Sequence, residues 1–206
     1  IAIDPTSPFS GGAVLGDRIR MTSHYSDPHV FVRSMATRGG QGGLALKTQE
    51  VGEIFDAAGF DVIIYETVGV GQIELDIILE TDTVVVVLVP ESGDEVQMLK
   101  AGLMEIGNIF AINKADRPGA NKLMVTLKNF LSTLSINEDY WLPQIVHTVA
   151  TEAKGTDDLV NSIDSHRIFN EEHGVQQQKM DEQYKRRITG IITDDYVEKI
   201  WNGANC

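Results

Sequence analysis

The feature of this sequence that most restricts its fold is an alternation of short β-branched segments with longer segments of helical periodicity. The apolar segments lie at 61–65, 83–89, 109–112 and 145–149, and the helical ones at about 43–58, 94–106, 120–135 and 156–172. Such an alternation is typical of βαβ units with parallel strands. The strands lack a polar residue at every second position, as expected when helices cover both faces of a sheet. The sequence therefore predicts an α/β fold with a doubly wound, mostly parallel sheet.

A helical extension follows this domain. The pattern from about 156 to 200 is almost entirely helical, and we expect breaks at Gly174 and Gly190. Apolar residues recur near helical spacing in the last part: Met180, Tyr184, Ile188, Ile191, Ile192, Tyr196 and Ile200. Such a stripe needs cover, either from the domain itself or from a partner subunit. We expect a domain over 1–172 and a helical arm over 173–206.

Composition excludes several classes of function. The chain has 206 residues, 30 of them acidic and 17 basic, with a net charge of −13. Nucleic acids and anionic membranes are bound through basic patches, and the cluster at 185–187 fits a solvated helix face. The longest apolar run, 84–89, is far below the roughly 20 residues that span a membrane. We expect no nucleic acid partner and no membrane span; the lone cysteine, Cys206, fits a reducing compartment.

The strongest motif is Asn113-Lys114-Ala115-Asp116, which directly follows the apolar strand at 109–112. The carboxylate of Asp116 can accept both the ring N–H and the exocyclic amine of guanine, a donor pair that adenine lacks, so one aspartate can select the base. Lys114 would lie across the base plane and Asn113 would join neighbouring loops. The alternative is a helix N-terminus capped by Asp116.

Two strand ends carry acids suited to a metal. Glu66 follows the strand at 61–65 and precedes the glycine-bearing loop 69–72, which suits a Mg²⁺-nucleotide site: a hard oxygen ligand, then a backbone N–H near a terminal phosphate. Asp4 ends an N-terminal strand, and Asp17 lies on the loop that follows. Asp4 and Asp17 could support a metal; the alternative is a turn former or a surface charge.

Four strings together resemble the MeaB/ArgK family of P-loop GTPases over roughly residues 1–175: DPTSPFSGG at 4–12, RSMATRG at 33–39, ETVGVGQ at 66–72 and NKADRPGA at 113–120. The resemblance implies a GTPase domain that binds Mg²⁺ and GTP or GDP. It implies a chaperone of an adenosylcobalamin-dependent acyl-CoA mutase of the methylmalonyl-CoA mutase type, which gates cofactor loading and protects the mutase. It further implies a homodimer joined by C-terminal helices, in the bacterial cytoplasm, or in the mitochondrial matrix of a eukaryote.

The resemblance also implies roles for individual residues. Asp4 and Glu66 would lie at Mg²⁺ with Asp17 close by, and the N–H of Gly69 would meet the γ-phosphate. The base would be held by six residues: Asn113, Lys114, Asp116, Thr148, Val149 and Ala150. The segment 90–100 corresponds to a further switch of the family, so Lys100 becomes a candidate for reaching the nucleotide; an exposed helix lysine is its ordinary interpretation.

The sequence departs from the family at two points. The phosphate-binding pattern G-x-x-x-x-G-K-[ST] does not occur in the printed sequence; in the family it precedes the strand that ends at Asp4. We therefore expect this chain alone to bind GTP poorly and, without a central strand, to expose strand edges. The position after Gly69, where Ras-type enzymes carry a water-orienting glutamine, is Val70, and Gln72 is the nearby candidate. We expect slow intrinsic hydrolysis that a partner accelerates.

Two alternatives differ in class. One is a nucleotide-free, GTPase-like interaction module, which the missing phosphate loop favours for this chain. The other is a related metal-insertion GTPase. Such proteins need histidine or cysteine clusters, and the five scattered histidines with Cys206 form none in the sequence.

Overall fold

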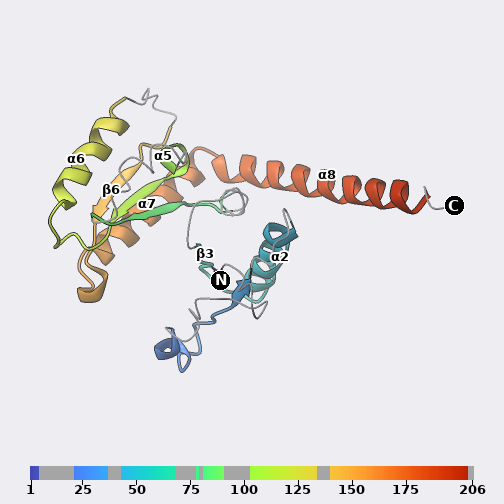
Figure 1. The fold of residues 1–206 in the computed structure, drawn as a ribbon, viewed down its shortest axis with the longest axis horizontal. Coiled ribbons are helices and arrows are strands. Elements are labelled where there is room, and N and C mark those ends of the chain that lie inside the picture. Colours follow the sequence, from blue (N-terminus) through green and yellow to red (C-terminus); the bar gives the residue numbers. More distant parts are fainter. Residues whose placement is uncertain are drawn as a thin grey trace. The chain divides into compact units, whose positions relative to one another are not determined.

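The computed structural model describes residues 1–4, 21–36, 43–67, 78, 81–90, 103–133 and 140–203. The chain divides into two compact units, Ile1–Thr81 and Asp82–Cys206, each with a three-stranded parallel sheet (Figure 1). The predicted α/β class with parallel strands is confirmed.

In the first unit, β1 (Ala2–Asp4) lies between β2 (Ser34–Ala36) and β3 (Glu66–Thr67). Ala2 aligns with Ser34 on one side and with Glu66 on the other. The remaining elements of this unit are the short 3-10 helix η1 (Thr22–His24) and α2 (Gly43–Ala57). Ile3 is buried against Ile1, Met35 and Tyr65. Strands of two or three residues give this unit a small core.

The strand predicted over 61–65 is wrong in its bounds, because β3 contains only Glu66 and Thr67. The register explains the difference. Since Glu66 aligns with Ala2, residues 62–64 would align with positions before Ile1. Just before β1, the amino group of Ile1 donates to the carbonyl oxygen of Ile64 at 2.6 Å. A strand is assigned only where ladder partners exist, so β3 begins at Glu66; Val62 and Ile64 are exposed.

In the second unit, β5 (Ile109–Ile112) lies between β4 (Val85–Leu88) and β6 (Gln144–His147). All four residues of β5 are buried, as its uninterrupted apolar run predicts. The helices are α5 (Leu103–Ile106), α6 (Ala120–Leu131), α7 (Thr156–Glu172) and α8 (Val175–Gly203), with a short 3-10 helix η2 (Ala150–Glu152) after β6.

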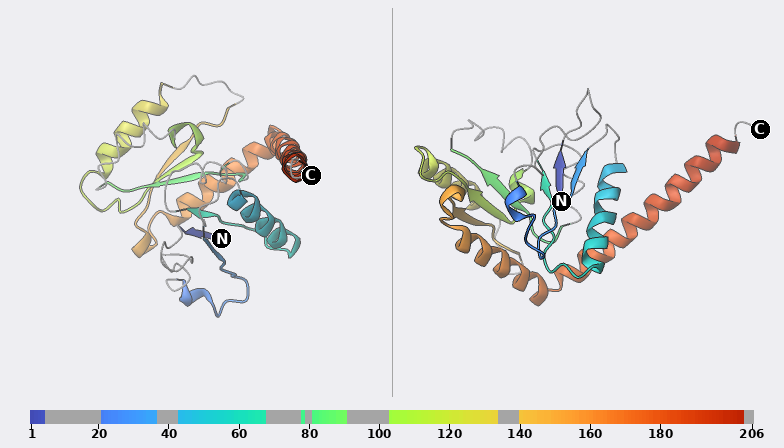
Figure 2. Two further views of the ribbon diagram at one scale, coloured as in Figure 1. Left: turned by 45° about the vertical axis from the view of Figure 1, so that its right-hand side comes forward. Right: turned by 90° about the horizontal axis from the view of Figure 1, so that it is seen from below.

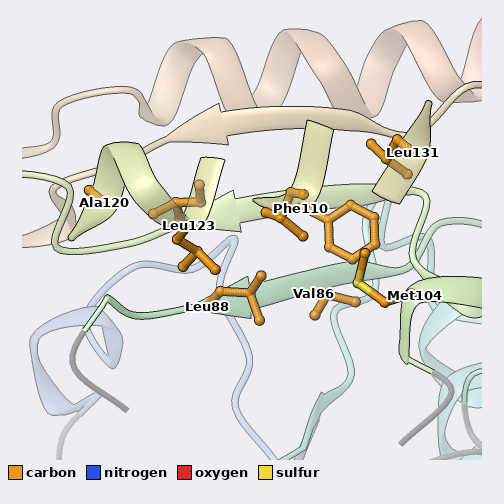
Figure 3. Packing of buried hydrophobic residues seen from close by; sticks show 9 residues of the cluster. Val86, Leu88, Met104, Phe110, Ala120, Leu123 and Leu131 are labelled. Atoms are coloured by element: carbon orange, nitrogen blue, oxygen red, sulfur yellow. The ribbon is translucent and has the colours of Figure 1, made fainter. Parts of the chain in front are cut away.

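The core of this unit lies between the sheet and helices α5 and α6. Leu123, Leu127 and Leu131 of α6 and Met104 of α5 pack against Val86, Leu88, Phe110 and Ile112 of the strands; Figure 3 shows the ring of Phe110 beside Met104 and Val86. Because side chains alternate along a strand, Ile109 and Ala111 face the opposite side, and both are buried. Helix α7 contacts β5 and β6. Helices thus cover both faces of this sheet.

Glycines with positive φ mark both ends of α7. Gly155 (φ +73°) precedes it, and Gly174 (φ +65°) separates it from α8. The helix predicted over 156–172 and the break at Gly174 are therefore confirmed. The break expected at Gly190 is wrong: α8 continues through it (Figure 2), because one interior glycine costs about 1 kcal/mol and does not by itself end a helix.

Helix α6 ends at Leu131, earlier than the predicted residue 135. The hydroxyls of Ser132 and Thr133 donate to the carbonyl oxygens of Asn129 and Phe130 at 2.7 and 2.6 Å. These hydroxyls bond the carbonyls that the end of a helix leaves without intrahelical partners.

A polar cluster joins α7 and α8 to the start of the second unit. His166 of α7 lies 2.8 Å from the hydroxyl of Thr83 through its Nδ1. The carbonyl oxygen of Asp82 accepts from Lys179 of α8 at 3.0 Å and from Asn170 of α7 at 3.5 Å. Trp141 lies edge-on against His166 and donates its indole N–H to the carbonyl oxygen of Asn108. These contacts fix the beginning of α8 against its own unit.

Beyond Lys179, α8 carries an exposed apolar face. Six large apolar side chains are exposed along it: Met180, Tyr184, Ile188, Ile191, Ile192 and Tyr196. Among the described residues, no helix has both the length and the apolar character that crossing a membrane demands. The domain boundary expected between 172 and 173 stays a prediction.

Candidate functional site

The predicted base-binding residues lie on two neighbouring loops of the second unit. Residues 113–116 follow β5 and residues 148–150 follow β6, and the two strands pair in parallel. Both loops therefore leave the same edge of the sheet, the carboxyl edge at which open α/β sheets bind ligands.

Asn113 joins these loops through its side chain. Its Oδ1 accepts from the backbone N–H of Ala150 at 3.1 Å and from the hydroxyl of Thr148 at 3.3 Å. The main chain adds a third link, since Ala115 N–H donates to the carbonyl oxygen of Thr148 at 3.0 Å. The joining role expected of Asn113 is thus visible in the structure, whereas its contact with a base stays a prediction.

Lys114 and Asp116 are both exposed at this edge. Lys114 has a left-handed backbone conformation (φ +55°), and its carbonyl oxygen accepts from Arg117 N–H at 3.0 Å, which turns the chain. The capping alternative for Asp116 is wrong, because the N-cap of α6 is Gly119 and no side chain caps that helix. The carboxylate of Asp116 therefore lies at the carboxyl edge without serving the following helix.

Residues 148–155 follow β6 and form a short hairpin that is closed by a backbone bridge. Val149 and Lys154 exchange backbone hydrogen bonds of 2.9 and 3.3 Å, and Ala153 between them has a left-handed conformation (φ +52°). Thr148 is buried.

Lys154 pairs with Glu152, whose hydrogen bond and charge raise the pKa of Lys154; Asp116 adds a smaller effect in the same direction. The hairpin thus places a cation in the electrostatic field of Asp116.

The predicted metal ligands belong to the first unit. Asp4 ends β1 and Glu66 begins β3, so the two residues lie on adjacent parallel strands. Glu66 is exposed; burial lowers the pKa of the Ile1 amino group, and the charge of Glu66 partly opposes that lowering. No group of three or more potential metal ligands gathers within the described ranges. Asp17 and the side chain of Asp4 lie outside those ranges, so the Mg²⁺ site stays a prediction.

The three candidate catalytic residues, Gly69, Gln72 and Lys100, also lie outside the described residues. Their roles stay predictions.

Sequence reasoning missed Gly155, where a Cβ would lie 1.9 Å from the carbonyl oxygen of His147. A glycine directly before a helical pattern was the available signal, but the contact with His147 depends on the folded hairpin. A groove of about 430 Å³ runs along β6; it is lined by residues of α6, β6 and α7 and includes none of 113–116 or 148–150.

Parallel sheets, one of them covered by helices on both faces, with polar loops at the carboxyl edge, define the α/β class to which P-loop GTPases belong. The crystal structure of a LAO/AO transport system kinase matches with a TM-score of 0.69 and 24% identity, over 96% of this chain and 59% of that one. At this identity the likeness shows the fold alone. The family follows from the sequence: the profile of the Methylmalonyl Co-A mutase-associated GTPase MeaB matches residues 1–205, and the chain belongs to that family.

Curated relatives agree with this assignment. A protein of Pyrococcus abyssi that is named as a GTPase is 51% identical over 98% of this chain and 64% of its own length. The GTPase ArgK of Escherichia coli is 34% identical over 79% of this chain and 50% of its own length. The resemblance to the MeaB/ArgK family is confirmed. The chain spans between half and two-thirds of the length of these relatives.

Proposed function

We propose that the full-length protein binds and hydrolyses GTP and serves as a chaperone of an adenosylcobalamin-dependent acyl-CoA mutase, of the methylmalonyl-CoA mutase type. Family membership supports the GTPase and mutase parts of this proposal. The observation that carries the nucleotide part is the bonding of Asn113 to both Thr148 and Ala150, which brings the two predicted base loops together.

The exposed residues of these loops fit guanine. Asp116 presents a carboxylate that can accept both guanine donors, and Lys114 next to it has a long aliphatic stem that can cover the base plane. The loops that carry them are fixed to each other, so little ordering is needed on binding, which favours affinity.

The phosphate part of the site would come from elsewhere in the protein. Asp4 and Glu66 are oxygen donors of the kind Mg²⁺ takes, and Mg²⁺, when bound, neutralises charge on the phosphates. We propose that a phosphate loop lies in a segment outside this chain, which the greater length of the relatives supports.

The direct test is base selection by the full-length gene product. We expect GDP to bind at least 100-fold more tightly than ADP, because one bidentate pair discriminates by about 1–3 kcal/mol and adenine leaves Asp116 unpaired as well. Asp116→Asn replaces an acceptor pair by one acceptor and one donor, which complements xanthine. Isothermal titration should show Asp116→Asn losing GDP and gaining xanthosine diphosphate.

The matched control is Asp56→Asn, an exposed acid on α2, which should keep the wild-type preference. Equal binding of GDP and ADP by the wild type would contradict the proposal. If the full-length protein binds no nucleotide but still binds purified methylmalonyl-CoA mutase, the interaction module becomes the better description.

A further inference from the structure

The 148–155 hairpin closes against the last residue of β6, and one position makes this closure possible. Gly155 has φ +73°, and a Cβ built on it would lie 1.9 Å from the carbonyl oxygen of His147 and 3.2 Å from the Cα of Thr148. Both neighbours are backbone atoms, so no side-chain rotation relieves the clash. A carbon and a carbonyl oxygen approach to roughly 3.3 Å at closest; any side chain at 155 therefore forces the two segments apart by about 1 Å or more.

A displacement of the hairpin would be transmitted to the loop 113–116 by the hydrogen bonds between the two segments. Thr148 adjoins the clash, and its hydroxyl and the N–H of Ala150 bond to Asn113 at 3.3 and 3.1 Å. Lengthening these bonds by about 1 Å takes both beyond hydrogen-bond distance. Asn113 would then lose the partners that join 113–116 to 148–150.

We propose that Gly155 is a positioning residue of the guanine site: its missing side chain allows the hairpin to close on β6 and so holds Thr148 and Ala150 against Asn113. This inference rests on the proposed function, since it concerns the same base site. Gly155 itself need not touch the nucleotide.

The experiment compares Gly155→Ala with Gly174→Ala in the full-length protein. Gly174 also has a positive φ (+65°), but a Cβ there meets nothing within 4 Å. Both variants carry the left-handed strain of alanine, and only Gly155→Ala adds the clash with His147. We expect Gly155→Ala to weaken GDP binding at least tenfold and to raise KM for GTP with kcat at saturation unchanged. Gly174→Ala should stay within twofold of the wild type.

A double-mutant cycle separates positioning from loss of stability. If Gly155 acts through Asn113, then Gly155→Ala should change GDP affinity less than twofold in an Asn113→Ala background. A full tenfold further loss in that background would overturn the proposal. So would equal GDP affinity of Gly155→Ala and the wild type.

The amide of Ala150 reports on the same link without nucleotide. Its hydrogen exchange should be faster in Gly155→Ala than in the wild type and Gly174→Ala, and unchanged exchange would overturn the proposal. If the wild type binds no GDP, the proposed function fails, and the positioning role fails with it. If Gly155→Ala does not fold, Thr148→Val removes one donor to Asn113 without backbone strain and should weaken GDP binding; wild-type affinity would overturn the proposal.

Discussion

His166 is a histidine with almost no exposure, and its surroundings fit a neutral ring. It is 2% exposed, and its Nδ1 lies within hydrogen-bond distance of two groups that can donate, the hydroxyl of Thr83 and the amide of Asn170. Nδ1 is therefore assigned as an acceptor, with the ring proton on Nε2. Burial first, and then the charge of Lys179, lower the pKa of His166 to about 4.

This shift predicts a loss of stability in mild acid. Above the usual pKa of 6.5 the ring is neutral in both the folded and the unfolded chain. As the pH falls from 6.5 toward 4, the unfolded chain binds a proton that the folded chain does not, so the free energy of unfolding decreases. Urea unfolding at pH 7 and pH 5 should show a smaller decrease in His166→Gln than in the wild type.

The matched control is His173→Gln, an exposed histidine of the same region whose ring stacks on Phe169. It should keep the wild-type pH dependence. Parallel decreases in all three proteins would show that carboxylates account for the acid sensitivity.

The elements α7 and α8 show what local sequence decides and what it does not. Helix α7 agrees with the range of about 156–172 that helical periodicity predicts, and in the structure the left-handed glycines Gly155 and Gly174 mark its two ends. Strand β5 was predicted equally well because its four residues are apolar and buried. Gly190 failed as a break because no turn residue supports it and the helix continues on both sides.

Gly190 now offers a test of α8. A Cβ at this position meets nothing within 4 Å, so Gly190→Ala should stabilise the helix locally by about 1 kcal/mol, the difference in helix propensity. Amide exchange over 186–194 should slow roughly fivefold, which is the factor that 1 kcal/mol represents. Gly174→Ala, with its positive φ, should have the opposite sign, and faster exchange in Gly190→Ala would contradict the continuous helix.

At the scale of the whole molecule, pairing between distant segments limits what a sequence can predict. The segment 61–65 has the composition of a strand, but a strand needs a neighbour in register, and the register of β3 with β1 starts only at Glu66. The base site likewise has one part that the sequence predicted and one part that depends on distant residues. The motif at 113–116 predicted the link made by Asn113, whereas the need for glycine at 155 depends on the carbonyl oxygen of His147, eight positions back along a hairpin.

The uncovered face of α8 leads to a prediction about assembly. We propose that a second copy covers it, in keeping with the homodimer expected from the resemblance. Ile188→Asp combined with Ile191→Asp places two charges on this face, where burial of unpaired charge is costly. Light scattering of the full-length protein should then show a monomer in place of a dimer.

Thr193, on the opposite side of α8, provides the control, and Thr193→Asp should leave the dimer intact. A wild-type monomer, or a dimer that survives both substitutions on the apolar face, would contradict this assembly.

The beginning of α8 is attached to the domain through a main-chain atom, the carbonyl oxygen of Asp82. Lys179 and Asn170 both donate to the carbonyl oxygen of Asp82, a group that every amino acid carries. A substitution at position 82 therefore leaves the acceptor in place, whereas a substitution at 170 or 179 can remove a donor. Among relatives of this protein, we expect the residue at position 82 to vary. We expect the donors at 170 and 179 to be conserved, because they attach α8 to the domain.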